Sequence, residues 1–429
     1  MRIGIQTWGS EGDVRPFLAL GHGLAARGHD VEIVVTDLDD RRYETQAAAL
    51  GARVRVVATP VVADKARLDA IGRQAIEAPN ALLQGKVIVD HLFTPVVDAL
   101  YDAALDLCGR VDVLVRHFFV HPAGAAAAKT GTPEVAVVLA HNMIPTRDIT
   151  PTGVPAIGRW ANPFWWRLAR FAANRVFLGD VNAVRARAGL APHADLMLDT
   201  WASRRLTLVA VSPSICARPA DWPASHAVTG FLSLPPAPAG PLPGEVEAFL
   251  ADGDAPVFFG FGSLMPKTPD LLAQTVETFR EAARLVKRRA VIQVPPSVLG
   301  HVAPAPGTLV VGAVPHLEVY PLSAAVVHHG GAGTTQSTLL SGRPSVVVPH
   351  VSDQFFWADE LRRLGVAPKA LVRGRLAAAP LAARLGTVLS DPSFATRAQA
   401  LGTRMRAEDG VAAAADAIER LTRNGPAPL

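Results

Sequence analysis

The stretch that decides the fold most clearly is Val326-Val327-His328-His329-Gly330-Gly331-Ala332-Gly333-Thr334-Thr335. A short apolar run typical of a buried strand ends in two histidines, and three glycines within four residues lead to two threonines that open a helix. Glycines let a backbone approach a ligand closely, and a helix N-terminus offers unpaired N–H groups with partial positive charge. The stretch therefore predicts a strand-to-helix junction that cradles a diphosphate, with Thr334 adding a hydroxyl donor.

Two other kinds of site are disfavoured at this junction. No lysine follows the glycines, as a Walker A loop requires. His328 and His329 are adjacent on a strand, so their side chains point to opposite faces and are poorly placed to bind one metal ion. A tight glycine-rich turn over two buried core histidines is the alternative to a ligand site.

The same alternation of strands and helices extends over the rest of the chain. The predicted strands are apolar on both faces and are joined by helical stretches, which indicates parallel sheets covered by helices on both sides. They lie at residues 2–5, 31–36, 53–57, 111–115, 135–139 and 206–211, and again at 256–261, 290–294, 308–311, 324–328 and 345–348. The chain is therefore predicted to be an α/β protein with two Rossmann-like parallel-sheet domains.

The boundary between the halves is the segment LSLPPAPAGPLPG at 232–244, whose five prolines and two glycines suit neither helix nor strand. We predict an N-terminal domain over 1–231, this linker, a C-terminal domain over 245–409, and a helix and tail over 410–429 that pack back on the N-terminal domain. Open parallel sheets bind ligands beyond the carboxyl ends of their strands. Two such sheets facing each other predict a cleft between the domains.

The first strand leads into the loop Gly9-Ser10-Glu11-Gly12-Asp13-Val14-Arg15-Pro16. A helix is predicted to begin near Pro16, because proline is favoured in a first turn. Asp13 lies just before that start, where capping the helix is its simplest role. A dinucleotide site is a further interpretation, since Asp37 ends the second strand where a ribose-binding acid is found, but the loop lacks the G-x-G-x-x-G pattern.

Two more junctions in the second half carry polar residues at the carboxyl end of a strand. Gly262 and Ser263 follow the first of these strands, and Ser263 can donate its hydroxyl to a phosphate. Asp353 and Gln354 follow the last one, and a carboxylate beside an amide suits the vicinal hydroxyls of a sugar. An ordinary turn for the first pair and a helix cap for Asp353 are the alternatives.

Together these stretches resemble the family 1 glycosyltransferases of the GT-B fold, in particular sterol glucosyltransferases and glycosyltransferases of antibiotic aglycones. The similarity lies in GSEGDVRPFLALGHGLAARGH at 9–29, HHGGAGTT at 328–335 and SDQFFW at 352–357. It extends over nearly the whole chain and is loosest over 60–200, where acceptor specificity would lie. The resemblance implies two facing Rossmann-like domains with a cleft between them, a nucleotide-sugar donor, and no cofactor or metal.

The resemblance also implies roles for individual residues. Asp13 corresponds to the general base, and His329 corresponds to the residue that contacts the diphosphate. Gly331, Gly333 and Thr334 complete the cradle. The other donor-binding residues that it implies are Ser10, Gly12, Ser263, Val314, His316, Asp353 and Gln354.

Two positions depart from the family pattern and leave the nucleoside open. Plant members stack uracil on a tryptophan where this chain has Val314, and many members place a ribose-binding glutamate where it has Ser337. Gln354 matches a glutamine that is common in enzymes using glucose, although relatives with deoxysugar donors share it. UDP-glucose is therefore the expected donor, and a dTDP-sugar is the alternative.

The acceptor site is predicted only from aromatic side chains. Phe118 and Phe119 follow a predicted strand on the cleft side of the N-terminal sheet, and Trp160 and Trp165 lie in an aromatic cluster at 160–166. Such residues bury large flat areas and would suit a sterol, a macrolide or a polyphenol. Packing in the core or between domains explains each of them equally well. The adjacent tryptophans at 165 and 166 allow at most a peripheral membrane contact.

Composition excludes several other classes of protein. The 429 residues carry 42 basic and 38 acidic side chains, and the basic ones are scattered, so the pI of about 9.3 does not indicate nucleic-acid binding. No apolar run approaches the length of a membrane span, and no secretory signal is predicted. Cys108 and Cys216 match no metal or redox spacing. We expect a cytoplasmic protein.

The sequence thus predicts an inverting, metal-independent glycosyltransferase. It would move a hexose, with glucose the first candidate, from a UDP-sugar to a hydroxyl of a lipophilic acceptor. An NAD(P)-dependent oxidoreductase is one alternative. A non-catalytic protein that binds nucleotide sugar or aglycone is another.

Overall fold

The computed structural model describes residues 1–38, 43, 50–59, 65–234, 242–266, 268–351 and 353–423. The middle of the predicted linker and the end of the C-terminal tail lie outside these ranges. The chain divides into two compact units, one formed by Met1–Pro235 with Glu408–Leu429 and the other by Pro236–Ala407. Within the described ranges no helix is both long and apolar enough to cross a membrane.

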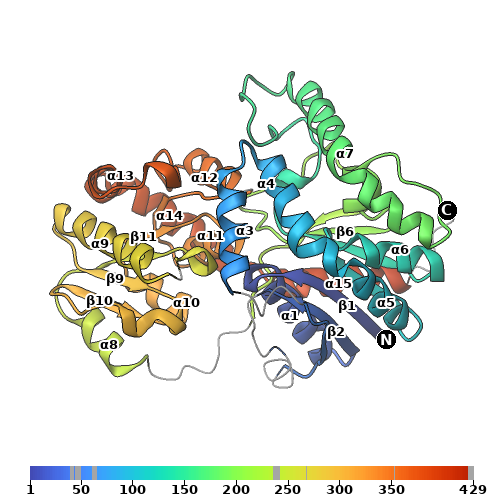
Figure 1. Ribbon diagram of the computed structural model, residues 1–429, viewed down its shortest axis with the longest axis horizontal. Coiled ribbons are helices and arrows are strands. Elements are labelled where there is room, and N and C mark those ends of the chain that lie inside the picture. The colour runs from blue at the N-terminus through green and yellow to red at the C-terminus, as the bar shows by residue number, and fades with distance from the viewer. Residues whose placement is uncertain are drawn as a thin grey trace. The chain divides into compact units, whose positions relative to one another are not determined.

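The first unit contains a parallel sheet with the strand order β3-β2-β1-β4-β5-β6-β7 (Figure 1). The strands are β1 Arg2–Gly9, β2 Asp30–Asp37, β3 Arg53–Val56, β4 Val113–His117, β5 Glu134–Val138, β6 Leu206–Val209 and β7 His226–Val228. The longer helices are α1 Glu11–Ala26, α3 Lys65–Glu77, α4 Ala81–Ile88, α5 Val97–Cys108, α6 His121–Thr130, α7 Asn162–Arg187 and α15 Gly410–Arg423. The short edge strand β7 was not predicted, because its three residues form no apolar run.

Successive residues of the central strands pack on opposite faces of this sheet. Val113 and Val115 belong to the core that α1 and α15 cover, whereas Leu114 belongs to the core formed with α5 and α6. On β1, a Cβ at Gly4 would lie 2.7 Å from the Leu107 side chain, so glycine allows α5 to approach the sheet closely. Burial on both faces explains why these strands were visible as continuous apolar runs.

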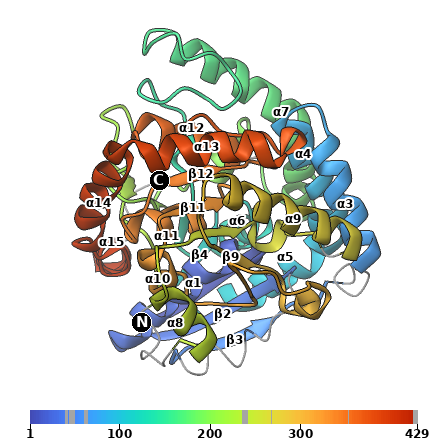
Figure 2. The ribbon, with the colours of Figure 1, turned by 90° about the vertical axis from the view of Figure 1, so that its left-hand side faces the viewer.

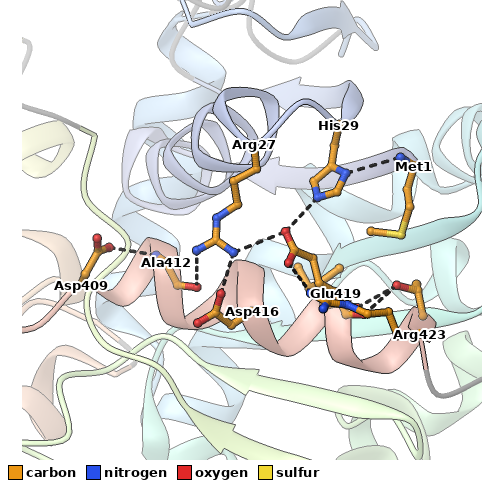
Figure 3. A network of polar contacts seen from close by, with 10 residues as sticks. Met1, Arg27, His29, Asp409, Ala412, Asp416, Glu419 and Arg423 are labelled. Carbon is orange, nitrogen blue, oxygen red and sulfur yellow. Dashed lines mark hydrogen bonds and ion pairs between the residues drawn. The ribbon is translucent and has the colours of Figure 1, made fainter.

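The helix α15 follows the second unit in the chain but packs on the first, against α1 and β6. Side chains of the turn after α1 form hydrogen bonds and ion pairs with α15 (Figure 3). Arg27 donates hydrogen bonds to Asp416 at 2.6 Å and to Glu419 at 3.3 Å, and the His29 ring lies 3.0 Å from Glu419. The hydrogen bond that His29 donates lowers the pKa of the Glu419 carboxyl below its usual range, and the hydrogen bond from Arg27 adds a smaller decrease.

The start of α1 differs from the prediction. The helix begins at Glu11 rather than near Pro16, so Asp13 lies in its first turn and not before it. Pro16 is the sixth residue of the helix and is buried. Ser10, as the N-cap, sets the earlier start, because its side chain and that of Asp13 cap the first turn together.

The second unit contains a parallel sheet with the order β10-β9-β8-β11-β12. The strands are β8 Val257–Gly260, β9 Ala290–Gln293, β10 Thr308–Val311, β11 Ala325–His328 and β12 Ser345–Val347. The helices are α8 Gly244–Ala251, α9 Pro269–Leu285, α10 His316–Val319, α11 Ala332–Leu340, α12 Gln354–Arg363, α13 Ala378–Ser390 and α14 Pro392–Arg406. Figure 2 shows α9 and α13 in front of this sheet, where they share one core with Phe259 and Val327.

Candidate active site

At the β1–α1 junction, the carboxylate of Asp13 folds back over the loop that precedes its helix. Its Oδ2 accepts hydrogen bonds from the backbone N–H of Ser10 at 2.9 Å and from the Ser10 hydroxyl at 3.2 Å. A Cβ at Gly9 would lie 2.3 Å from that oxygen, and Gly9 has a φ of 135°, so only glycine fits beneath the carboxylate. The Asp13 side chain is still 37% exposed. It both caps the helix and reaches solvent.

A histidine that the sequence analysis did not single out lies beside this carboxylate. His117 ends β4, the neighbour of β1, and its Nε2 is 3.8 Å from Oδ1 of Asp13. The ring is buried, and neither of its nitrogens has a hydrogen-bond partner among the described residues. Burial, and to a smaller extent the charge of Arg116, lower the pKa of His117 to about 3. His117 is therefore uncharged at neutral pH. The only feature of the sequence that marks it is its place near the end of a strand.

An aromatic cluster lies next to His117. Phe118 has its ring centroid 4.7 Å from that of His117 and 5.4 Å from that of Trp201. Phe119 packs on Trp8 at 5.9 Å and on Phe93 at 5.2 Å. Phe118 and Phe119 are only half-buried, so this cluster presents apolar surface close to Asp13. Trp8, Phe93 and Trp201 were not predicted, because a single aromatic residue in an apolar run looks like ordinary core.

The other two predicted acceptor residues lie elsewhere. Trp160 lies just before α7 and is 78% exposed. The ring of Trp165 packs on that of Phe164 in the first turn of the helix. In the part of the chain that the structure describes, no ring contact joins Trp160 or Trp165 to the cluster around Phe118. The structure therefore groups Phe118 and Phe119 with Asp13 and leaves the two tryptophans apart.

At the β11–α11 junction, the backbone rather than side chains shapes the loop. Gly330 has a φ of 89°, and a Cβ there would lie 2.9 Å from Val347 and 3.0 Å from the carbonyl oxygen of Gln354. Gly331 is the N-cap of α11, and no side chain caps this helix. A Cβ at Gly333 would meet nothing within 4 Å. The space beside Gly333 is thus open, and the neighbouring Thr334 is half-buried.

The two histidines of this junction have different surroundings, as their adjacency on a strand predicts. His328 is fully buried and its Nδ1 accepts a hydrogen bond from the N–H of Gly330 at 3.1 Å, which holds the turn. His329 is half-buried, and its ring lies against two glycines: a Cβ at Gly331 would be 2.5 Å from its Nε2, and one at Gly262 3.3 Å from its Cε1. Burial lowers the pKa of His329 to about 4, so it is a neutral hydrogen-bonding group.

Three loops meet around His329 because β8, β11 and β12 are neighbours in the sheet. The loop after β8 brings Gly262 against the ring and leaves Ser263 exposed. The loop after β12 brings the backbone of Gln354 against Gly330. This loop also contains Asp353, and burial raises the pKa of that carboxyl to about 6 although hydrogen bonds oppose this shift. Asp353 is the N-cap of α12, yet its side chain makes no cap hydrogen bond there.

Gln354 is more constrained than the sequence suggested. Its Oε1 accepts hydrogen bonds from the backbone N–H groups of His350 at 2.8 Å and Val351 at 3.1 Å. Only its amide N–H groups are left to donate to a ligand. The Oε1 of Gln354 therefore stabilises the loop after β12 by two hydrogen bonds.

The predicted nucleobase positions lie at the start of α10. The Nε2 of His316 is 3.0 Å from Oε1 of Gln293, and its ring stacks on Tyr320 with centroids 4.6 Å apart. Val314 is partly buried against the same small core. The His316 ring is thus held by its own domain.

The remaining predicted donor-binding residue is Gly12, and the remaining departure from the family pattern is Ser337. Gly12 is exposed in the first turn of α1, and Ser337 lies on α11. Within the described ranges, no group of three or more His, Cys, Asp or Glu side chains is arranged to hold a metal ion.

Comparison with known proteins agrees with this geometry. The profile described as "Erythromycin biosynthesis protein CIII-like, C-terminal domain" matches residues 277–421. The O-mycaminosyltylonolide 6-deoxyallosyltransferase of Streptomyces fradiae is 34% identical over 98% of this chain and 97% of its own length. The chain belongs to the GT-B glycosyltransferase family that includes antibiotic glycosyltransferases and sterol glucosyltransferases.

Two further matches, one in sequence and one in fold, agree with this assignment. A sterol 3-beta-glucosyltransferase of Arabidopsis thaliana is 26% identical over 98% of this chain and 68% of its own length. The structure of the Streptomyces sp. SF2575 glycosyltransferase SsfS6, complexed with thymidine diphosphate, superposes with a TM-score of 0.66 at 19% identity and covers 98% of this chain and 99% of its own. The predicted GT-B fold, with its two parallel-sheet α/β domains, is confirmed.

Proposed function

We propose that this glycosyltransferase moves a hexose from a nucleoside diphosphate sugar to a hydroxyl of a lipophilic acceptor, with inversion at the anomeric carbon. The observation that carries the proposal is the uncapped N-terminus of α11, where glycine backbone, Thr334 and a neutral His329 border open space. The antibiotic and sterol relatives support a lipophilic acceptor such as a macrolide, a sterol or a polyphenol.

The donor half of the reaction belongs to the second unit. As the bond from the anomeric carbon to the diphosphate breaks, negative charge grows on the leaving oxygen. The N–H groups at the start of α11, the Thr334 hydroxyl and the His329 ring stabilise that charge by hydrogen bonds and by the helix dipole. Asp353 and the amide of Gln354 hold the sugar hydroxyls. This arrangement needs no metal ion, and we expect full activity in the presence of EDTA.

The acceptor half belongs to the first unit. The acceptor oxygen forms its bond to the anomeric carbon while its proton passes to the Asp13 carboxylate. General-base help of this kind contributes about 10²–10⁴-fold to the rate. Ser10 holds Oδ2 of Asp13, and the uncharged His117 lies next to Oδ1, so one oxygen is fixed and the other has a neutral neighbour. Phe118 and Phe119 offer the acceptor an apolar wall.

The test is to incubate the chain with UDP-glucose or dTDP-glucose and a panel of sterols, macrolides and polyphenols, and to analyse the products by mass spectrometry. We propose UDP-glucose as the donor, and the SsfS6 complex with thymidine diphosphate is the reason to include dTDP-glucose. A product heavier by one hexose supports transfer and identifies both substrates. Binding of donor and acceptor without any product would instead indicate a non-catalytic binding protein.

A further inference from the structure

The first half of α7 exposes large apolar side chains in a single line. Phe164, Leu168 and Phe171 are 63%, 48% and 69% exposed, and Trp160, just before the helix, is 78% exposed. Spacings of four and three residues place Phe164, Leu168 and Phe171 along one face of the helix. These three residues together with Trp160 are called here the α7 stripe. Trp160, Phe164 and Phe171 are also the exposed Trp and Phe residues of the part of the chain that the structure describes.

The α7 stripe is not the face by which the helix joins its own unit. Trp166, Ala173 and Val181 are buried against Leu196 and Met197. At about 100° per residue, the stripe lies on the side of the helix opposite Trp166. The first half of α7 therefore has two apolar faces, of which only one is covered within the unit, and an amphipathic surface helix needs only one.

The charged residues within the segment that carries the α7 stripe are arginines. Residues 149–179 contain no Asp or Glu but four arginines. Arg159 pairs with Asp148 and Arg170 pairs with Asp195, whereas Arg167 and Arg175 are exposed and form no ion pair with a described residue. Arg175 continues the stripe four residues after Phe171, and Arg167 stands four residues before Phe171.

We propose that the α7 stripe binds the surface of a membrane that contains anionic lipids. Trp and Phe side chains favour the headgroup region, and neighbouring arginines gain energy from the negative charge of the lipids. A second copy of the chain is a poorer partner, because a symmetric contact would bring the same arginines together. The residues in contact differ from the predicted pair of adjacent tryptophans, since Trp166 is buried. The proposal does not depend on the transferase reaction.

The test is flotation of the full chain with vesicles of phosphatidylcholine alone or with about a third phosphatidylglycerol. We expect binding to the anionic vesicles and about tenfold weaker partitioning of the double variant F164S/F171S. The control L271S/L285S removes two side chains that are each 46% exposed on α9, and it should bind like the wild type. Circular dichroism of all variants checks that they are folded.

A second variant separates charge from apolar contact. R167Q/R175Q should lose about tenfold in partitioning to anionic vesicles and little to neutral ones. The proposal is overturned if the wild type floats with neither kind of vesicle, or if F164S/F171S binds as the wild type does. It is also overturned if light scattering shows a dimer that F164S/F171S dissociates, because a second copy would then cover the stripe.

Discussion

The β1–α1 and β11–α11 junctions both lead from the carboxyl end of a parallel strand into a helix, and they treat the helix N-terminus in opposite ways. At α1, Ser10 and Asp13 cap the first turn with their own side chains. At α11, a glycine is the N-cap and no side chain caps the helix. The first junction thus has a side-chain cap with a partly exposed carboxylate, and the second has no side-chain cap.

Under the proposed function, this difference lets one architecture supply both a base and an anion site. A carboxylate fixed at one oxygen by Ser10 can accept a proton at the other, and it repels a phosphate. Unpaired N–H groups at a helix dipole attract a phosphate and accept no proton. Variants at one junction at a time test whether catalysis and donor binding depend on different junctions.

The largest effect is expected for Asp13→Asn. The amide can keep a contact with Ser10 but cannot take the acceptor proton, so kcat should fall by about 10²–10⁴-fold. The Kd for the donor should stay unchanged, because the residues of the proposed cradle belong to the other unit. Steady-state kinetics and calorimetry measure the two quantities. Near-normal turnover would reduce Asp13 to a helix cap.

The next largest effect is expected for Gly333→Ala. The added methyl group meets nothing within 4 Å in the protein, so the melting temperature should stay the same or rise slightly. It would enter the space proposed for the diphosphate, and donor affinity should fall by about tenfold or more.

The matched control for Gly333→Ala is Gly386→Ala in α13, where an added Cβ also meets nothing within 4 Å. This control should bind the donor as the wild type does. Equal donor affinity in the two variants would show that the diphosphate does not lie at the start of α11.

A smaller effect on rate is expected for His117. Replacing it by Leu removes the polar neighbour of Oδ1, and kcat should fall by about tenfold with the donor KM unchanged. His117→Gln keeps a polar group and should recover part of the rate. The pH profile of kcat separates positioning from packing: the Leu variant should shift its acidic limb, whereas a purely structural role would leave the profile in place.

Donor binding should also depend on pH through Asp353. Burial raises the pKa of this carboxyl to about 6, so it is ionised at pH 7 and protonated at pH 5. Protonation removes an acceptor for the sugar hydroxyls, and donor affinity should weaken several-fold as the pH falls across this range. Asp353→Asn should bind weakly at both values, and a wild-type affinity that does not change with pH would contradict the proposed contact.

The smallest effect is expected for Ser10→Ala, which breaks the cap of α1. Stability should fall by about 1 kcal/mol, measured by denaturant unfolding, while donor affinity is unchanged. A loss of donor affinity in this variant would place Ser10 in the donor site, as the family resemblance implied.

The sequence was sufficient for the features that depend on local pattern. Doubly buried strands such as β1 and β11 appear as apolar runs, and the glycines of 330–333 mark the junction without further information. The predicted start of α1 is too late, because it rests on Pro16 as a first-turn residue. The capping contact between Ser10 and Asp13 sets the true start at Glu11.

Contacts across strands could not be predicted in this way. His117 meets Asp13 only because β4 pairs with β1, and more than a hundred residues separate them in the chain. The cluster of Trp8, Phe93 and Phe119 arises from the same pairing of distant segments. The assignment of Trp160 to the acceptor site rests on residue type alone. Its exposure in the segment before α7 could not be predicted from the sequence.

The most direct test is calorimetric titration of UDP and dTDP into the wild type, Asp13→Asn and His329→Ala. We expect the wild type and Asp13→Asn to bind one of the nucleotides equally well, and His329→Ala to bind it about tenfold more weakly or worse. If His329→Ala binds as tightly as the wild type while Asp13→Asn loses affinity, the division of roles between the two junctions is wrong.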